Sequence, residues 1–502
     1  MSNKQSPYTY LSLTVSVCPT CHASIPASLK ERDGRIYMTK SCPHHGRFVT
    51  LIASNAEWYK RAQSERSPSL MLRSYQTKTS GGCPQDCGVC PEHEQNNSVP
   101  VIEITNICNL DCPICFADNR HDYKMTVEEF ERCLDILEES GSDVDVLILT
   151  GGEPTAHPQL VEFVERAYRR PGIPRVGIAT NGILIGKKEK LIAELVRAGA
   201  YILLQLDSLD TKKNQVLRGN EMHDYREAAL AALEKHDAQA AIIMTVIAGL
   251  NDDELGTILD YTLHRPFMRG LEIQTMSYTG SGGSTVKFNP MTRITGTDLI
   301  DRIVEQSSGL LRREDFAPML HPHPNCVAIT YLLALRDGGF IPFPRFTTPE
   351  AYRKAIMSSF VVQPDERHEA FLTELIDHVW ANQDSIARAS EILVTLRDML
   401  QSLYPSDREI TEAERLILGQ RYVKNIFLHN YMDAHSLDAE VLRKCTSMQI
   451  VPDGRMIPNC GYRTIHRKTD PRWKRESENL GHGVDGIRSQ LSRGTRNLPI
   501  VE

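Results

Sequence analysis

Residues 101–116 read VIEITNICNLDCPICF, and this stretch decides the fold that the sequence predicts. An apolar, β-branched run leads directly into Cys108, Cys112 and Cys115, which are spaced Cys-x3-Cys-x2-Cys. Three thiolates on one loop can hold three irons of a [4Fe–4S] cluster and leave the fourth iron without a protein ligand. A zinc loop is the plainer alternative, but zinc sites usually close with four ligands and no fourth ligand is nearby. The spacing therefore favours a cluster with one open iron.

From residue 99 onward the sequence alternates between strand-like and helix-like segments. The expected strands cover residues 100–106, 145–150, 174–180, 201–206, 240–248 and 270–276. The expected helices cover residues 126–140, 158–169, 187–198, 222–236 and 252–263. This α/β series predicts a parallel sheet that right-handed crossovers curl into a partial (β/α)6 barrel of the TIM type. In such barrels the chemistry lies at the carboxyl ends of the strands, which is where the cysteine loop is expected.

A second motif, Gly151-Gly152-Glu153-Pro154, follows the expected strand 145–150. Glycines allow the backbone to approach a ligand closely, and a carboxylate at this place can pair with an ammonium group. The same residues would also make a good turn. Their position at the end of the second strand is what favours a ligand site.

Together these motifs resemble the radical S-adenosylmethionine superfamily over residues 99–285. The resemblance implies that Cys108, Cys112 and Cys115 hold a catalytic [4Fe–4S] cluster whose open iron binds S-adenosylmethionine, which is cleaved to a 5′-deoxyadenosyl radical. It also implies cofactor contacts from Gly151, Gly152, Glu153 and Pro154 at the amino group, Thr180 and Asn181 after strand three, Ser208 at the ribose, Arg218 at the carboxylate, Ile247 at the adenine, and Phe116. The alternatives are ordinary turn residues at strand ends and a core position for Phe116.

An amino-terminal group consists of Cys18, Cys21, Cys42 and His45, with His44 and His22 as other candidates for the fourth ligand. Two short knuckles at this separation suit one tetrahedral ion, either zinc or a single iron. A disulfide or unligated thiols are the alternative. The arrangement resembles a rubredoxin-like or zinc-ribbon module, with a structural role or a role in electron delivery.

Cys83, Cys87 and Cys90 repeat the Cys-x3-Cys-x2-Cys spacing in a glycine-rich loop. We expect an auxiliary [4Fe–4S] cluster here, completed by His93 or a distant cysteine, because the strand and Gly-Gly-Glu context of the catalytic cluster belongs to Cys108. Three late cysteines indicate a third cluster or, alternatively, buried free thiols: Cys326, Cys445 and Cys460. Cys133 is expected in the core.

The chain has 502 residues and a net charge of −7, so no basic field indicates nucleic-acid binding. Without a signal-like segment or an apolar run of ~20 residues we expect a cytoplasmic protein, with peripheral membrane contact left open. Four parts are expected: a knuckle domain over 1–60, a linker and auxiliary-cluster loop over 61–98, the radical barrel over 99–285, and a substrate and auxiliary-cluster region over 286–502.

The last of these parts is expected to be mostly helical. Helical patterns cover residues 297–307, 366–403 and 411–427. A short hairpin is expected over 445–465, turned by Asp453-Gly454. The region also offers apolar residues that could line a channel or simply form core: Val327, Ile329, Tyr331, Leu332, Leu333 and Leu335.

The order of these parts over nearly the whole chain resembles the tetraether lipid synthases. That resemblance implies hydrogen abstraction from the terminal methyl group of a lipid chain, followed by carbon-to-carbon coupling of two chains. It also implies an electron donor such as ferredoxin or flavodoxin.

Two other functions stay open. The first is a radical methylase of a pterin-like heterocycle, in which Cys326 or Cys460 would accept a methyl group. The second is a maturase or cluster-relay protein. The Gly-Gly-Glu motif argues against the relay, which needs no S-adenosylmethionine pocket.

Overall fold

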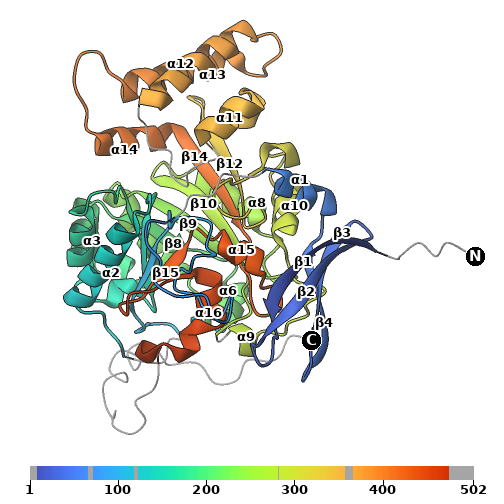
Figure 1. Ribbon diagram of the computed structural model, residues 1–502. Coiled ribbons are helices and arrows are strands. Elements are labelled where there is room, and N and C mark those ends of the chain that lie inside the picture. Colours follow the sequence, from blue (N-terminus) through green and yellow to red (C-terminus); the bar gives the residue numbers. More distant parts are fainter. Residues whose placement is uncertain (1–7, 66–71, 118–121, 281, 357–365, 474–502) are drawn as a thin grey trace, which may run out of the picture.

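The computed structural model describes residues 8–65, 72–117, 122–280, 282–356 and 366–473. Its first part is an antiparallel sheet in the order β1-β2-β3-β4. These strands span Thr9–Val17, Ser24–Arg32, Arg35–Cys42 and Gly46–Ala53, and helix α1 (Ala56–Ser64) follows. The sheet buries Leu29, Ile36 and Met38 in a small core of its own with Tyr59 of α1. It lies beside the larger body of the molecule (Figure 1).

The larger body is built on parallel strands whose positions confirm the predicted strand series. They are β5 (Val101–Thr105), β6 (Leu147–Gly151), β7 (Val176–Thr180), β8 (Tyr201–Gln205), β9 (Ala240–Val246) and β10 (Met268–Thr275). They pair in sequence order. Every residue of β5 is buried, as expected for a parallel strand that is covered on both faces.

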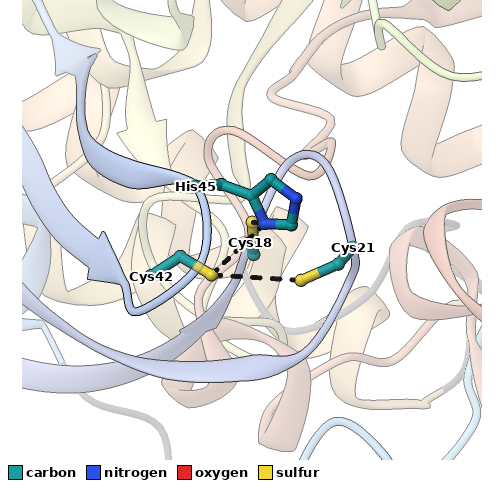
Figure 2. A group of neighbouring side chains, drawn as sticks. All are labelled: Cys18, Cys21, Cys42 and His45. Carbon is teal, nitrogen blue, oxygen red and sulfur yellow. Dashed lines mark hydrogen bonds between the residues drawn. The ribbon is translucent and has the colours of Figure 1, made fainter.

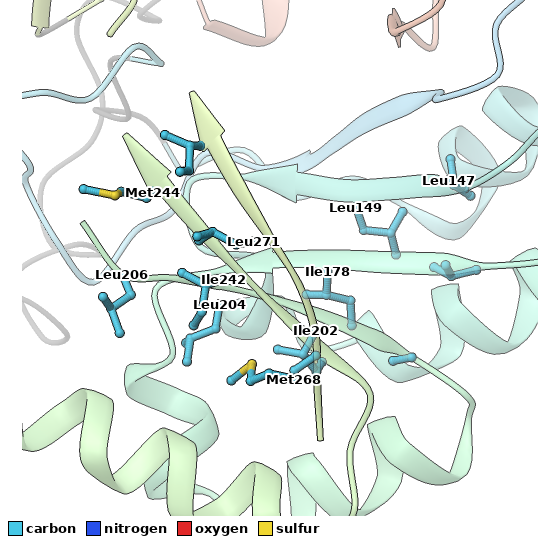
Figure 3. Close-up of a cluster of buried hydrophobic side chains, with 14 of the residues drawn as sticks. Leu147, Leu149, Ile178, Ile202, Leu204, Leu206, Ile242, Met244, Met268 and Leu271 are labelled. Carbon is cyan, nitrogen blue, oxygen red and sulfur yellow. The ribbon is translucent and has the colours of Figure 1, made fainter. Parts of the chain in front are cut away.

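Helices cover the outer face of this sheet and confirm the predicted helices. They are α2 (Val127–Ser140), α3 (Leu160–Tyr168), α5 (Glu189–Arg197), α7 (His223–Lys235) and α8 (Leu255–Leu263), with α4 (Ile183–Lys187) and α6 (Thr211–Arg218) in addition. Thr126 and Glu129 form a capping box at the start of α2, and Gly141 ends the helix in the left-handed conformation. Between the helices and the strands lies the main core, in which Leu149, Ile202 and Ile242 point outward from the barrel (Figure 3).

The region after residue 285 contributes further strands, of which the sequence predicted only the late hairpin. Helix α9 (Gly282–Thr285) leads into it, and its helices are α10 (Gly296–Gln306), α11 (Pro349–Ile356), α12 (Glu366–Ala381), α13 (Ala389–Leu403), α14 (Glu412–Tyr422), α15 (Ala439–Arg443) and α16 (Asn459–Thr464). Its strands are β11 (Ala317–Pro318), β12 (Val327–Ala334), β13 (Phe340–Pro342), β14 (Val423–His429), β15 (Met448–Ile450) and β16 (Met456–Pro458).

Two helix predictions for this region were wrong in part. The helix expected over 411–427 ends at Tyr422, and the next residues form β14, in which Lys424, Ile426 and Leu428 are buried in strict alternation. A period of two residues is the strand pattern, and it overrides the helical pattern that precedes it. The helix expected over 366–403 is divided into α12 and α13 by residues 382–388. The hairpin expected over 445–465 is confirmed for β15 and β16, whereas residues 459–464 form helix α16 instead.

These late strands extend the barrel sheet on both sides. β14 pairs in parallel with β10, and β12 pairs antiparallel with β14. At the other edge β15 pairs in parallel with β5 through Gln449 and Val101. The sheet therefore continues across the boundary that we predicted at residue 285.

A second core covers the face of β12 that carries Ile329, Tyr331 and Leu333, and it involves α12 and α13, which project from the barrel (Figure 1). It takes up most of the apolar residues that we considered as channel walls: Ile329, Tyr331, Leu333 and Leu335. None of the helices in the described ranges combines the length and the apolar composition that a membrane crossing requires.

The core contact between α2 and α3 gives a test of this fold. The rings of Phe130 and Phe163 stack with centroids 4.4 Å apart, and both side chains are fully buried. Phe163→Ala should lower the free energy of unfolding by about 3–5 kcal/mol, because the lost ring leaves a cavity. Urea unfolding followed by circular dichroism measures this loss. Trp380→Ala is the control, since Trp380 is 57% exposed; equal losses for the two variants would contradict the assigned core.

Candidate active site and metal centres

The cysteine loop leaves β5 at the carboxyl end of the barrel. Cys108, Cys112 and Cys115 all line the cavity inside the barrel. Backbone N–H groups of Leu110 and Ala117 donate to the sulfurs of Cys108 and Cys115 at 3.5 and 3.4 Å. Burial, and then the charges of Cys112 and Glu153, raise the pKa of the Cys108 thiol. Three neighbouring, partly buried thiols that repel one another as thiolates fit a cationic iron cluster between them.

The Gly-Gly-Glu segment packs directly against the start of this loop. The N–H groups of Gly152 and Glu153 donate to the carbonyl oxygens of Thr105 and Ile107 at 2.7 and 2.8 Å. A Cβ atom at Gly152 would lie 2.4 Å from the Ile107 oxygen, and one at Gly151 would lie 2.0 Å from the Thr105 oxygen. The two glycines therefore bring the end of β6 against the cysteine loop, which no other residue type would allow.

Glu153 is a buried carboxylate without a cationic partner among the described residues. It is 1% exposed and accepts hydrogen bonds from the backbone N–H groups of Thr155 and Asn181 at 3.0 and 2.9 Å, and from the Thr180 hydroxyl at 2.6 Å. Burial raises its pKa. A buried charge is stable only when it is paired, so the free side of this carboxylate fits an ammonium group. Thr180 and Asn181, both predicted, orient it.

Arg218 brings a positive charge to the same end of the cavity. Its Nε lies 2.5 Å from the Asp207 carboxylate, which also accepts the N–H of Thr245 at 2.8 Å. Burial raises the pKa of the Cys112 thiol to about 11, and Arg218 opposes this shift. The guanidinium thus lies beside a cluster cysteine.

Asp207 was not predicted as a site residue, although it follows the fourth strand, where such residues are expected.

The other predicted cofactor residues are placed differently. Phe116 lines the cavity, as do Gly151 and Gly152. Ser208 does not line it, and donates its hydroxyl to Glu254 at 2.6 Å. Ile247 packs with Ile114, Leu217 and Met276 behind the cavity wall. Pro154 begins a single 3-10 turn, η1 (Pro154–Ala156), and is buried.

Sequence reasoning missed a cluster of arginines that helix α16 brings to the cysteine loop. Arg463 lines the cavity, lies over the Phe116 ring at 4.4 Å, and is paired with Glu103 of β5. Arg467 lies 3.5 Å from the same carboxylate. The sequence did contain a signal for this cluster, because Glu103 interrupts the apolar strand 101–105. A charge that is buried within a strand requires a partner from elsewhere in the chain.

The cavity runs the length of the barrel. Its volume is about 290 Å³, and it extends from the cysteine loop to residues at the amino ends of the strands, such as Val99, Val146 and Arg175. Inward-facing apolar residues form most of its wall: Ile148, Ala179, Leu203, Ala241, Ile243, Val327 and Phe427. A polar strip consists of Glu272, Gln274, Asn425 and His429. Of the channel walls proposed from sequence, only Val327 belongs to this lining in the described residues.

The amino-terminal group has the geometry of a site for a single metal ion. The ligand atoms of Cys18, Cys21, Cys42 and His45 all lie within 4.8 Å of one another. His45 Nδ1 lies 3.6 Å from the Cys18 sulfur and 3.5 Å from that of Cys42, which is 4.0 Å from the Cys21 sulfur (Figure 2). Four converging ligands of these types suit a tetrahedral ion. His45, and not His22 or His44, completes the set.

The second cysteine group lies against the carboxyl-terminal hairpin. Cys83, Cys87, Cys90 and His93 line one small recess. The neighbouring thiols, Cys83 first and Cys445 among the others, raise the pKa of Cys87. His93 donates its Nε2 hydrogen to the Cys445 carbonyl oxygen at 3.0 Å. Both candidates for the fourth ligand therefore lie near this group: His93 itself, and Cys445 as the distant cysteine.

The structure also brings the late cysteines near one another. Cys445 and Cys460 both raise the pKa of Cys326 beyond the effect of burial. Cys460 lines the central cavity, and the Cys326 sulfur lies 3.6 Å from His429 Nε2. Cys133 packs in the main core, as predicted.

Comparison with known proteins assigns the barrel. Residues 102–262 match the family described as the Radical SAM superfamily, where SAM is S-adenosylmethionine. The chain contains a radical SAM domain. It therefore uses a [4Fe–4S] cluster and S-adenosylmethionine, for which the cysteine loop, Glu153 and Arg218 provide fitting residues. Residues 10–54 match the family described as the HMPTM N-terminal zinc ribbon domain, in agreement with the four-ligand site.

Individual relatives cover the chain to different extents. A 7,8-dihydro-6-hydroxymethylpterin dimethyltransferase of Methanocaldococcus jannaschii is 29% identical over 490 residues, which cover 91% of this chain and 94% of the relative. A GTP 3′,8-cyclase of Syntrophomonas wolfei is 33% identical over 196 residues, which cover 36% of this chain and 58% of that enzyme.

Solved structures align with less than half of this chain, at low TM-scores. Streptococcus suis SuiB bound to S-adenosylmethionine has a TM-score of 0.36 at 21% identity and covers 42% of this chain and 47% of its own. Methylornithine synthase has a TM-score of 0.33 at 17% identity and covers 43% and 63%, respectively.

The amino-terminal metal site can be tested by its metal content. Cys21→Ser should remove one metal ion per chain, because it deletes one of four converging ligands, and should lower the melting temperature. Inductively coupled plasma mass spectrometry of anaerobically purified protein measures the ion and shows whether it is zinc or iron. Cys133→Ser is the control for loss of a thiol; a variant at Cys21 with the full metal content would contradict the site.

The unpaired carboxylate gives a second test. Glu153→Gln should weaken binding of S-adenosylmethionine about 10- to 100-fold, since it removes a charge-assisted bond to an ammonium group. Because burial raises the pKa of Glu153, wild-type affinity should also fall as the pH is lowered toward that pKa, and the variant should lack this dependence. Equilibrium dialysis measures both.

Glu162→Gln is the matched control for that experiment. Its side chain is 41% exposed on α3 and pairs with Arg166. Equal affinities of the two variants, at every pH, would contradict the assignment of Glu153.

Proposed function

We propose that this radical SAM enzyme abstracts hydrogen from an unactivated C–H bond of a long, saturated lipid chain and couples two such chains carbon to carbon. The observation that carries the proposal is the cavity through the barrel. Its wall is mostly aliphatic, and it reaches from the cysteine loop to the amino ends of the strands. An elongated apolar chain fits such a space with one end beside the cluster cysteines.

The residues at the carboxyl end position the cofactor in this proposal. Bound there, the cluster and S-adenosylmethionine supply a 5′-deoxyadenosyl radical after one-electron reduction. Glu153 pairs with the amino group of the cofactor, and Arg218 lies on the side where its carboxylate would bind. Arg463 lies over the ring of Phe116, which follows Cys115 directly.

The coupling reaction balances without a further oxidant. One hydrogen atom leaves each chain, and two molecules of 5′-deoxyadenosine carry both hydrogens away while the new C–C bond forms. Each cycle of cofactor cleavage needs one electron from an external donor, for which we propose a ferredoxin or flavodoxin. The auxiliary cysteine sites lie between the surface loop at Cys83 and the cavity wall at Cys460, which suits electron transfer to the centre.

A second candidate function is methylation of a pterin-like heterocycle. It is favoured by the relative that is named a pterin dimethyltransferase, which matches this chain over 91% of its length. The polar strip of Glu272, Gln274, Asn425 and His429 offers hydrogen-bond partners for a heterocycle. Cys460 lines the cavity and is the thiol placed to accept a methyl group. A cluster relay would not need the pocket at Glu153.

The two enzyme functions differ in product. A host that expresses the chain should accumulate lipids of doubled chain mass, and the reduced protein should form two 5′-deoxyadenosines per coupled product. Mass spectrometry of lipid extracts and of pterin fractions measures both outcomes. Cys112→Ser, which cannot hold the catalytic cluster, is the control. A methylated pterin with unchanged lipids would replace the first function by the second, and absence of 5′-deoxyadenosine would overturn both.

A further inference from the structure

The buried charges that line the central cavity fall into two groups. Arg218 is paired with Asp207, and Arg463 with Glu103. Glu272 is only partly buried, and its carboxylate lies 3.6 Å from His429 Nδ1. Glu153 at the carboxyl end and Arg175 at the amino end are different, because the described residues supply no opposite charge within 4.0 Å of either. The ammonium group of the cofactor would supply the opposite charge for Glu153. No group described so far supplies one for Arg175.

Arg175 immediately precedes β7 and points into the far end of the cavity. It is 7% exposed, and its guanidinium lies over the Tyr201 ring at 4.7 Å. Gln420 of α14, with its amide oxygen turned toward Arg175, accepts hydrogen bonds from both Nη atoms and donates to Gln239 at 2.8 Å. A neutral amide satisfies donors but does not neutralise a charge. Asp145 raises the pKa of Arg175, but by less than the three tyrosines around it: Tyr201, Tyr168 and Tyr331.

A second buried guanidinium reinforces the positive charge at this end. Arg269 of β10 is 4% exposed, donates through Nη1 to the Pro266 carbonyl oxygen at 2.7 Å, and has a buried Nε without a hydrogen-bond partner. Burial lowers the pKa of both arginines, and Arg175 lowers that of Arg269 further. Tyr201 is close enough to both for them to oppose the rise of its pKa. Asp145 and Asp237 act on Arg175 and Arg269, respectively, but neither forms an ion pair with them within 4.0 Å. Two buried cations near one another, without a paired carboxylate, favour an anion between them.

We propose that Arg175, supported by Arg269 and Tyr201, binds an oxyanion, a phosphate or carboxylate group, at the amino end of the barrel. The inference deepens the proposed function and rests on it: the substrate is an anionic amphiphile whose charged end is held at Arg175. Strand β7 separates Arg175 from Thr180, and its five residues span about 17 Å. An extended chain anchored at Arg175 therefore presents its far end to the cysteine loop, where the radical forms.

Such an anchor would explain how an apolar channel selects one carbon. A smooth aliphatic wall holds a chain without defining its position along the channel. A charge-assisted contact at one end fixes the register, so that distance from the anchor decides which C–H bond meets the cofactor.

Binding of decyl phosphate and of 1-decanol to the reconstituted holoenzyme tests the inference. Isothermal titration calorimetry should show that the wild type binds the phosphate about 10- to 100-fold more tightly than the alcohol, as expected for one charge-assisted anchor. Arg175→Gln should bind the two equally, while Arg175→Lys should retain part of the preference because it retains the charge. Arg169→Gln, whose side chain is 72% exposed on the surface, should behave as the wild type.

Equal binding of phosphate and alcohol by the wild type would overturn the inference, as would equal loss of preference in Arg175→Gln and Arg169→Gln. Retained preference in Arg175→Lys shows that the effect follows the charge and is not a consequence of misfolding. Displacement of decyl phosphate by inorganic phosphate would support the oxyanion site and assign it to a free anion as well as to a head group. Preserved decyl phosphate binding in an enzyme that leaves lipids unchanged would overturn the proposed coupling and not the anion site.

Discussion

The structure depends on the backbone contact between the end of β6 and the start of the cysteine loop. Two N–H groups of the Gly-Gly-Glu segment donate to carbonyl oxygens that precede Cys108. This contact requires glycine, because a single Cβ atom would collide with the neighbouring backbone. It determines where the three thiols lie relative to Glu153. It thereby joins two motifs that are separated by 35 residues of chain between Cys115 and Gly151, an interval that includes α2. Neither motif could form the site without the other.

Charge balance organises the rest of the site. A charge that is buried in the barrel must be matched by a neighbour or by a ligand. Asp207 matches Arg218, and Glu103 matches Arg463 and Arg467. Where the described residues do not provide the match, as at Glu153, we expect a ligand to provide it. Glu103 is informative in this respect, because it draws the last helix of the described chain against the first strand of the barrel and so covers the cysteine loop from above.

Much of this arrangement could be predicted from the sequence. The strand before Cys108, the glycines after β6 and the spacing Cys18, Cys21, Cys42 and His45 are local patterns, and local patterns are sufficient when the residues that bind together are close in the chain. Contacts between distant parts of the chain could not be predicted in this way. Arg463, the partner of Glu103, and Cys445, the neighbour of Cys87, each lie more than 300 residues further along the chain. The strand β14 was missed for another reason: it follows α14 without a turn, and only the alternation around Ile426 marks the change.

The late strands explain why a radical barrel of this kind needs so long a carboxyl-terminal region. β14 pairs with β10 and turns Phe427 and His429 into the cavity, while β15 pairs with β5 at the opposite edge. The hairpin of β15 and β16 lies between Cys445 and Cys460. The same short element extends the sheet, brings one thiol near the Cys83 loop and another to the cavity wall. The cavity wall and the approach of the late cysteines to that loop therefore depend on the same segment. A chain that lost this hairpin would lose both together, which ties the chemistry of the barrel to the folding of its last described segment.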